Sequence, residues 1–127
     1  MANMHHYECL VKVEATFIPE QSDVERNRYA FSYHVTITNT GDIAAQLISR
    51  HWIIVEADGQ QQEVKGLGVV GDQPLLAPKQ SYEYTSGTVI QTPMGKMYGS
   101  YQMVAEDGTR FDATIPTFLL NMPRVLH

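Results

Sequence analysis

The sequence has a single cysteine, no long apolar run and no excess of basic residues. Cys9 alone cannot form an intrachain disulfide or a zinc site of the paired-cysteine kind, and we expect it to be a small buried hydrophobe. No apolar stretch approaches the roughly 18 residues of a membrane span, so no membrane insertion is expected. The formal net charge of −5 disfavours binding to nucleic acid or to an anionic membrane surface.

The amino terminus also lacks a charged segment followed by an apolar core, which argues against a secretory signal and predicts a cytoplasmic protein. The chain has 127 residues, of which 43% are hydrophobic. At this size about two thirds of the unfolded surface can be buried, so no metal or disulfide is needed for stability. We expect one domain over residues 1–127, with its core between about 5 and 123.

Apolar and polar residues alternate through most of the chain, which is the pattern of half-buried β-strands. The clearest example runs from Tyr29 to Thr38 and ends in an Asn-Thr-Gly-Asp turn. Other strands are predicted at 9–17, 46–56, 62–66, 82–90, 97–105 and 109–119, and residues 66–80 are predicted to form a long loop. No segment keeps a helical period. The pattern predicts an all-β, antiparallel two-sheet sandwich of seven or eight strands.

A glycine-rich segment interrupts this pattern. Gly66, Gly68 and Gly71 have the spacing G-x-G-x-x-G that binds pyrophosphate in dinucleotide folds, but Pro74 follows and no helical pattern does. Two interpretations stay open. The glycines shape a turn or a close packing at a strand end, or backbone N–H groups form a concave site for an anion, with Lys65 adding positive charge.

Arg50, His51 and Trp52 form a second group of interest. On a strand Arg50 and Trp52 share one face and His51 takes the other. We expect Trp52 to anchor the core. Arg50 must then either reach the sheet edge or lie across an aromatic ring, and it is a candidate for ligand binding. His51 has no partner at a diagnostic spacing.

Patterns typical of catalysis are lacking. Neither Ser86 nor Ser100 lies in a G-x-S-x-G elbow, and the five histidines form no metal-ligand motif. No catalytic residue, metal ligand or cofactor is therefore predicted, although a divalent cation is left open. Tyr101, near the start of the penultimate strand, is a candidate for the tyrosine corner of such sandwiches.

Five separated blocks stand in the order found in the ApaG family: 33–39, 50–52, 66–74, 84–87 and 99–103. The chain resembles this family over about residues 5–123. The resemblance implies a fibronectin type III-like sandwich and an indirect association with cobalt resistance and magnesium efflux. In the family the glycine motif has been regarded as a pyrophosphate-binding loop, and similar eukaryotic domains suggest an interaction module. Lys79 stands where the family commonly has glycine.

These observations favour a small binding module without catalytic activity. The candidate ligand- or anion-binding residues are Gly66, Gly68, Gly71, Lys65 and Arg50. Its ligand is expected to be a partner protein or a phosphorylated small molecule. The alternative is a nucleotide- or pyrophosphate-binding protein, either a sensor or an enzyme, that uses the 66–71 loop with a divalent ion. Exposed edge strands are compatible with a monomer or a homodimer.

Overall fold

The smaller of two sheets contains three antiparallel strands in the order β1–β2–β6. The computed structural model describes residues 4–123. In it β1 spans Cys9–Phe17, β2 spans Tyr29–Asn39 and β6 spans Ser81–Ile90. The polar segment between β1 and β2 forms two short 3-10 turns, Pro19–Gln21 and Val24–Arg26. The alternating pattern therefore predicted all three strands to within a residue or two.

The larger sheet has the order β4–β3–β7–β8, again antiparallel. Its strands are β3 (Ala45–Glu56), β4 (Gln61–Leu67), β7 (Met94–Ala105) and β8 (Arg110–Asn121). A fifth strand of two residues, β5 (Leu75–Leu76), also pairs with β3. Because β4 and β5 both lie along the same side of β3, the segment that joins them bulges from the edge of this sheet.

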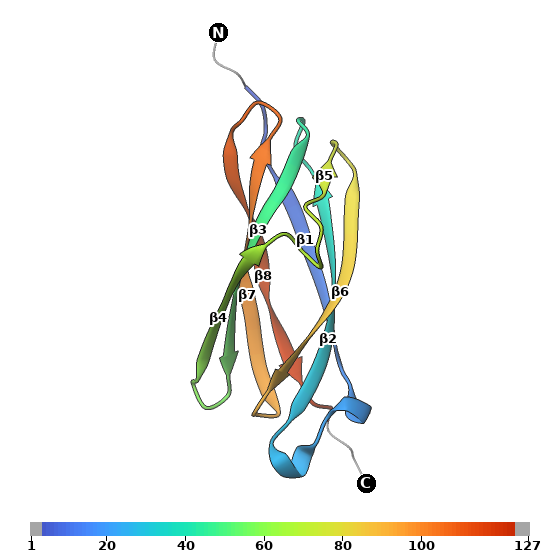
Figure 1. Ribbon diagram of the computed structural model, residues 1–127, viewed down its shortest axis with the longest axis vertical. Helices are drawn as coiled ribbons and strands as arrows, with labels where there is room; N and C mark the ends of the chain where they lie inside the picture. Colours follow the sequence, from blue (N-terminus) through green and yellow to red (C-terminus); the bar gives the residue numbers. More distant parts are fainter. Residues whose placement is uncertain (1–3, 124–127) are drawn as a thin grey trace.

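The two sheets face each other as a sandwich, and their strands run along the long axis of the molecule (Figure 1). On one side β1 lies against β8. On the other side the edge strands β4 and β6 are not hydrogen-bonded to each other anywhere in the described chain. We call this the open side of the sandwich. The fold confirms the two-sheet sandwich expected from the alternation of the sequence.

Aromatic rings fill the space between the sheets. Trp52 is only 2% exposed and its ring contacts those of Tyr33, Tyr101 and Phe118. Cys9 is buried as well. Trp52 is thus the expected core anchor, and Cys9 is the expected buried hydrophobe. No helix within residues 4–123 is long and apolar enough to cross a membrane.

Two local expectations were wrong. The hydroxyl of Tyr101 does not make a tyrosine corner, because it is hydrogen-bonded at 2.5 Å to the hydroxyl of Tyr84 on the opposite sheet. Both phenols are buried, and this burial raises the pKa of Tyr84 to about 12 and that of Tyr101 further. Residues 66–80 are not one uninterrupted loop either, since they contain β5 and a tight hairpin turn.

Candidate functional site

The glycine loop, residues 66–74, crosses the open side of the sandwich. Figure 1 shows the chain leaving β4, running toward β6 and then turning into β5. Its start is fixed to Ile48, which lies at a register shift in β3. The Ile48 carbonyl accepts the Gly68 N–H at 2.8 Å and the Gln73 side-chain amide at 2.9 Å. A bulge in β3 therefore supplies the carbonyl that holds both ends of the loop.

The tip of the loop is a two-residue hairpin turn. Val69 and Asp72 exchange both backbone hydrogen bonds at 2.8 Å. Between them Val70 and Gly71 have φ of +42° and +86°, the signs required by a type I′ turn. Such turns favour Asn-Gly or Gly-Gly. A β-branched residue at positive φ is a strained exception, so sequence propensity gave no signal for this turn.

Each glycine of the motif has its own structural reason. A Cβ at Gly66 would lie 2.8 Å from three atoms of the Arg50 guanidinium, so Gly66 makes room for that side chain. Gly68 has φ of +64°, and a Cβ there would lie 2.4 Å from the Asp72 carbonyl oxygen. Gly71 supplies the second positive φ of the turn, where a Cβ would meet open space. The glycines are not followed by a helix, since the chain continues through Pro74 into β5.

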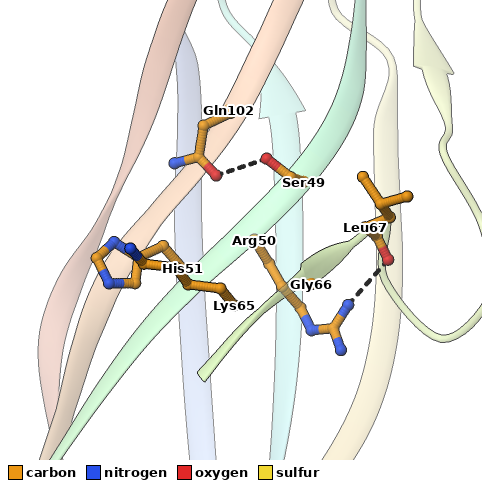
Figure 2. Close-up of a pocket in the computed structure, with 7 residues that line it drawn as sticks. All are labelled: Ser49, Arg50, His51, Lys65, Gly66, Leu67 and Gln102. Atoms are coloured by element: carbon orange, nitrogen blue, oxygen red, sulfur yellow. Dashed lines mark hydrogen bonds between the residues drawn. The ribbon is translucent and has the colours of Figure 1, made fainter. Parts of the chain in front are cut away.

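Arg50 fixes the loop to the edge of the larger sheet. Its Nη1 donates at 2.9 Å to the carbonyl oxygens of both Leu67 and Gly68, and Figure 2 shows the first of these bonds. Of the two placements open from the sequence, the structure selects the sheet edge. Arg50 shares the inward face of β3 with Trp52, and its side chain ends at the open side.

Lys65 lies on the other face of the same sheet. In Figure 2 its side chain runs beside His51, away from the Arg50 guanidinium. The His51 imidazole is 2.7 Å from the Glu63 carboxylate, and the Lys65 ammonium is 3.3 Å from it. These two contacts, with His51 the stronger, hold the pKa of Glu63 below its ordinary value. Of the five candidate residues, Arg50, Lys65 and Gly66 line one open pocket of about 470 Å³ (Figure 2). Gly68 and Gly71 lie outside this pocket, Gly68 at the start of the turn and Gly71 at its tip.

Half of the backbone N–H groups of residues 68–73 are used within the protein. Those of Gly68, Val69 and Asp72 donate to backbone carbonyls. Within residues 68–73 of the described chain, the N–H groups of Val70, Gly71 and Gln73 have no such acceptor. An anion would therefore find only part of the loop's amides available.

The loop is also joined to the smaller sheet, a connection that the sequence did not suggest. The Tyr82 hydroxyl on β6 donates to the Asp72 carboxylate at 2.9 Å. Burial, followed by this carboxylate, raises the pKa of Tyr82. The side-chain amide of Gln46 adds a bond to the Gln73 carbonyl at 3.0 Å. Hydrogen bonds from both sheets thus hold the loop in one shape.

Three aliphatic side chains project from this well-fixed edge. Leu67 is 75% exposed, Val70 58% and Leu75 62%. We call these three residues the aliphatic edge. With Val64, four of the ten exposed large hydrophobics of the described chain fall within residues 64–75. Sequence reasoning overlooked them, although Leu67 and Val70 lie between the glycines of the motif and Leu75 follows it directly after Pro74.

Metal ligation and thiol chemistry have little support in the described residues. No group of three histidine, cysteine or acidic side chains between residues 4 and 123 is placed to hold a metal ion. The buried thiol of Cys9 has a pKa raised to about 11 by desolvation, which keeps it protonated and unreactive.

The fold and the loop define a small two-sheet β-sandwich module with a rigid glycine loop across its open side. The family model described as the ApaG domain matches residues 19–105. The chain is 61% identical over 127 residues to Protein ApaG of Nitrosospira multiformis and equally similar to that of Methylobacillus flagellatus, with both chains covered completely. The protein therefore belongs to the ApaG family.

Solved structures agree with this assignment. A crystal structure of a Bordetella pertussis protein described as ApaA superimposes with a TM-score of 0.90 at 53% identity, and the match covers 94% of this chain and 97% of that one. A second X-ray structure, at 49% identity, has a TM-score of 0.87 with 94% and 91% coverage. The sandwich and its strand order are therefore a shared property of these proteins.

Proposed function

We propose that this protein is a binding module whose ligand is an extended segment of a partner protein. The segment lies along β4, the glycine loop and β5, with apolar side chains against the aliphatic edge. The observation that carries the proposal is the exposure of Leu67, Val70 and Leu75 on a rigid part of the fold. Exposed aliphatic groups of this kind favour protein contact when the backbone beneath them is already ordered.

Strand β4 offers a second type of contact. It has seven residues and pairs only with β3, so the backbone groups on its other side are unpaired within the described chain. An extended peptide can add to such an edge as a further strand. Backbone hydrogen bonds would then provide affinity, and the aliphatic edge would select apolar side chains at alternate positions.

The candidate residues support this surface from behind. Arg50 holds the carbonyls of Leu67 and Gly68, and Gly66 leaves space for its guanidinium. Gly68 and Gly71 allow the turn that presents Val70. Lys65, which is 68% exposed at the side chain, is left to contact a polar or acidic group of the partner.

Phosphate binding at the same loop is the competing function. Lys65 and the unpaired N–H groups of Val70 and Gly71 favour it, and a divalent ion would have to contribute. Because Gly68, Val69 and Asp72 already donate to carbonyls, we regard protein binding as the better use of this geometry. Any association with cobalt resistance or magnesium efflux is then assigned to the partner rather than to ion binding by the module.

Photo-crosslinking from the folded protein in cells tests the proposal. Benzoylphenylalanine is placed at Leu67 or Leu75 in one set of variants, and at Leu119 in a control. Leu119 is also 62% exposed but lies on β8, far along the sheet from β4. We expect one defined protein to be linked from positions 67 and 75 and not from 119, and its linked peptide to be an extended apolar segment.

The other outcomes are equally informative. Crosslinks to a second copy of this chain would show that the partner is the protein itself, as a homodimer. Equal labelling from positions 67 and 119 would overturn the proposal. In a parallel titration of magnesium pyrophosphate and magnesium ATP, saturable shifts confined to the amides of residues 66–73 would favour phosphate binding instead.

A further inference from the structure

A second concave site lies on the open side of the sandwich, between β3 and β4 of the larger sheet and β6 of the smaller one. This pocket has a volume of about 210 Å³. Six side chains decide its chemistry: Tyr33, Arg50, Trp52, Ile54, Ser86 and Thr88. It is separate from the aliphatic edge, because none of Leu67, Val70 and Leu75 lines it.

Two hydroxyl groups stand where a sandwich normally places apolar side chains. Tyr84 and Ile90 are the buried, inward-facing residues of β6, and Ser86 and Thr88 lie between them with the same parity. Both are half-buried. Neither hydroxyl has a hydrogen-bond partner among residues 4–123. Inward positions of a two-sheet fold usually complete the apolar core, so this polar pair calls for another explanation.

Further donors converge on the same space. Only Nη1 of Arg50 is bound to the loop carbonyls, which leaves its Nε and Nη2 hydrogens without an acceptor in the described chain. The Trp52 indole N–H and the Tyr33 hydroxyl likewise have no partner within residues 4–123. No fully buried side-chain nitrogen or oxygen of the described chain lacks a partner, so these groups must be partly accessible. Tyr33, Arg50 and Trp52 all line this pocket, and Arg50 also lines the larger pocket beside Lys65.

The charge of the lining selects the sign of the ligand. Arg50 is the charged residue of the pocket, and no carboxylate lines it. Donors therefore outnumber acceptors, and a neutral ligand would leave the guanidinium without a counter-charge. The floor is apolar, since Trp52, Ile54 and Met97 are each 4% exposed or less. At about 210 Å³ the pocket is smaller than those that hold drug-sized ligands, which span roughly 300–1,000 Å³.

We propose that this pocket binds a small organic anion. Its carboxylate or phosphate group accepts hydrogen bonds from Arg50, Ser86 and Thr88, and its apolar or aromatic body lies against Trp52. The charged end is held by several donors at once, which is how proteins achieve tight binding of small anions. The apolar floor adds affinity for an anion that carries a ring or a short chain and so favours it over a purely inorganic ion.

Titration with simple probes tests this site, because Trp52 is the only tryptophan of the sequence and lines the pocket. Benzoate and phenyl phosphate represent the two anion classes, and benzyl alcohol is the neutral control of similar shape. Binding is followed by the fluorescence of Trp52 and by the NMR signal of its indole N–H. The test variant combines Ser86→Ala with Thr88→Val. The control is Thr85→Val, which removes a hydroxyl from the opposite face of the same strand.

We expect a saturable change with at least one of the two anions, and the ratio of their affinities identifies the preferred class. The double variant should weaken that binding by roughly tenfold or more, because each lost hydrogen bond joins a hydroxyl to a charged group. Thr85→Val should leave the affinity unchanged. The proposal is overturned if neither anion binds below about 10 mM, if benzyl alcohol binds as tightly, or if the double variant binds like the wild type.

Arg50 is not used as the main test variant, because its loss would also release the glycine loop. Thr88→Val alone is nearly isosteric and provides a milder second variant. A circular dichroism spectrum identical to that of the wild type establishes that each variant is folded. A folded variant with unchanged anion affinity would place the binding elsewhere and contradict the assignment.

Discussion

Replacing Gly68 by alanine should destabilise the protein more than the same replacement at Gly71. Both glycines have positive φ, +64° and +86° respectively. An L-residue in this left-handed region costs about 1–2 kcal/mol. The backbone conformation alone would therefore lower the free energy of unfolding by nearly the same amount in the two variants. Any difference between them measures how closely the new methyl group is packed.

The difference follows from what the new methyl group meets. At Gly71 nothing lies within 4 Å, whereas at Gly68 the Cβ would be 2.4 Å from the Asp72 carbonyl oxygen. An ordinary contact begins near 3.4 Å, so this carbonyl must move by about 1 Å. The movement breaks the bond from the Val69 N–H to this carbonyl. The second bond of the turn, from the Asp72 N–H to the Val69 carbonyl, is then lost as well, which makes two lost bonds. Each such bond contributes about 1 kcal/mol, which places Gly68→Ala at about 3–4 kcal/mol and Gly71→Ala at about 1–2.

Urea unfolding followed by the fluorescence of Trp52 measures both losses. Gly108→Ala is the control, because Gly108 has φ of +88°, an open surrounding and a position in a remote hairpin. It should match Gly71→Ala. In thermal unfolding we expect a decrease in Tm of about 3–5 °C for each kcal/mol in a chain of this size. Equal losses at positions 68 and 71 would refute the packing argument.

Other predictions concern single sites. Lys79→Gly should stabilise the chain by about 0.5–1 kcal/mol in urea unfolding, because Lys79 has φ of +72° in an exposed turn; no gain would contradict it. Val70→Gly should likewise stabilise the fold but lower crosslinking from position 67, since it removes strain and a side chain of the aliphatic edge. Native Cys9, with its pKa raised to about 11, should react with iodoacetamide at pH 8 at least about 100-fold more slowly than in urea, as measured by mass spectrometry. The pKa of Glu63 lies below its ordinary 4.5, so its contribution to stability is present above that pH and lost as the pH falls through the folded value; the stability difference between wild type and Glu63→Gln should shrink steadily as the pH is lowered below 4.5.

The strands were predictable because one physical rule governs them. A buried face and a hydrated face impose alternation, and β2 shows it from Tyr29 to Asn39. The β3–β4 and β7–β8 hairpins were also predictable, because an Asp-Gly pair marks each turn. Gly59 and Gly108 have the positive φ that such turns need. The two-residue strand β5 could not be predicted, because two residues carry no periodicity.

The loop and the pocket depend on contacts that the local sequence does not contain. Val70 adopts a positive φ against its propensity because Val69 and Asp72 are held by both sheets. Arg50 had two possible placements in the sequence, and only the position of the Leu67 and Gly68 carbonyls decides between them. The sequence shows that Ser86 and Thr88 share one face of their strand with Tyr84 and Ile90. It does not show that their hydroxyl groups find no hydrogen-bond partner across the sandwich among the described residues.

The same spacing of glycines therefore has a different physical meaning here from that in a dinucleotide fold. There the glycines free backbone N–H groups at a helix start, whereas here the N–H groups of Gly68, Val69 and Asp72 are bonded to carbonyls. Within residues 68–73 of the described chain, only the N–H groups of Val70, Gly71 and Gln73 are left to bind an anion, so the loop gains less from wrapping one than a loop with all its N–H groups free. Its order is established in the free protein, so a partner that contacts Leu67, Val70 and Leu75 need not provide the entropy of fixing them. In the proposed function, recognition is therefore assigned to the exposed aliphatic groups in and beside the motif and not to the glycines themselves.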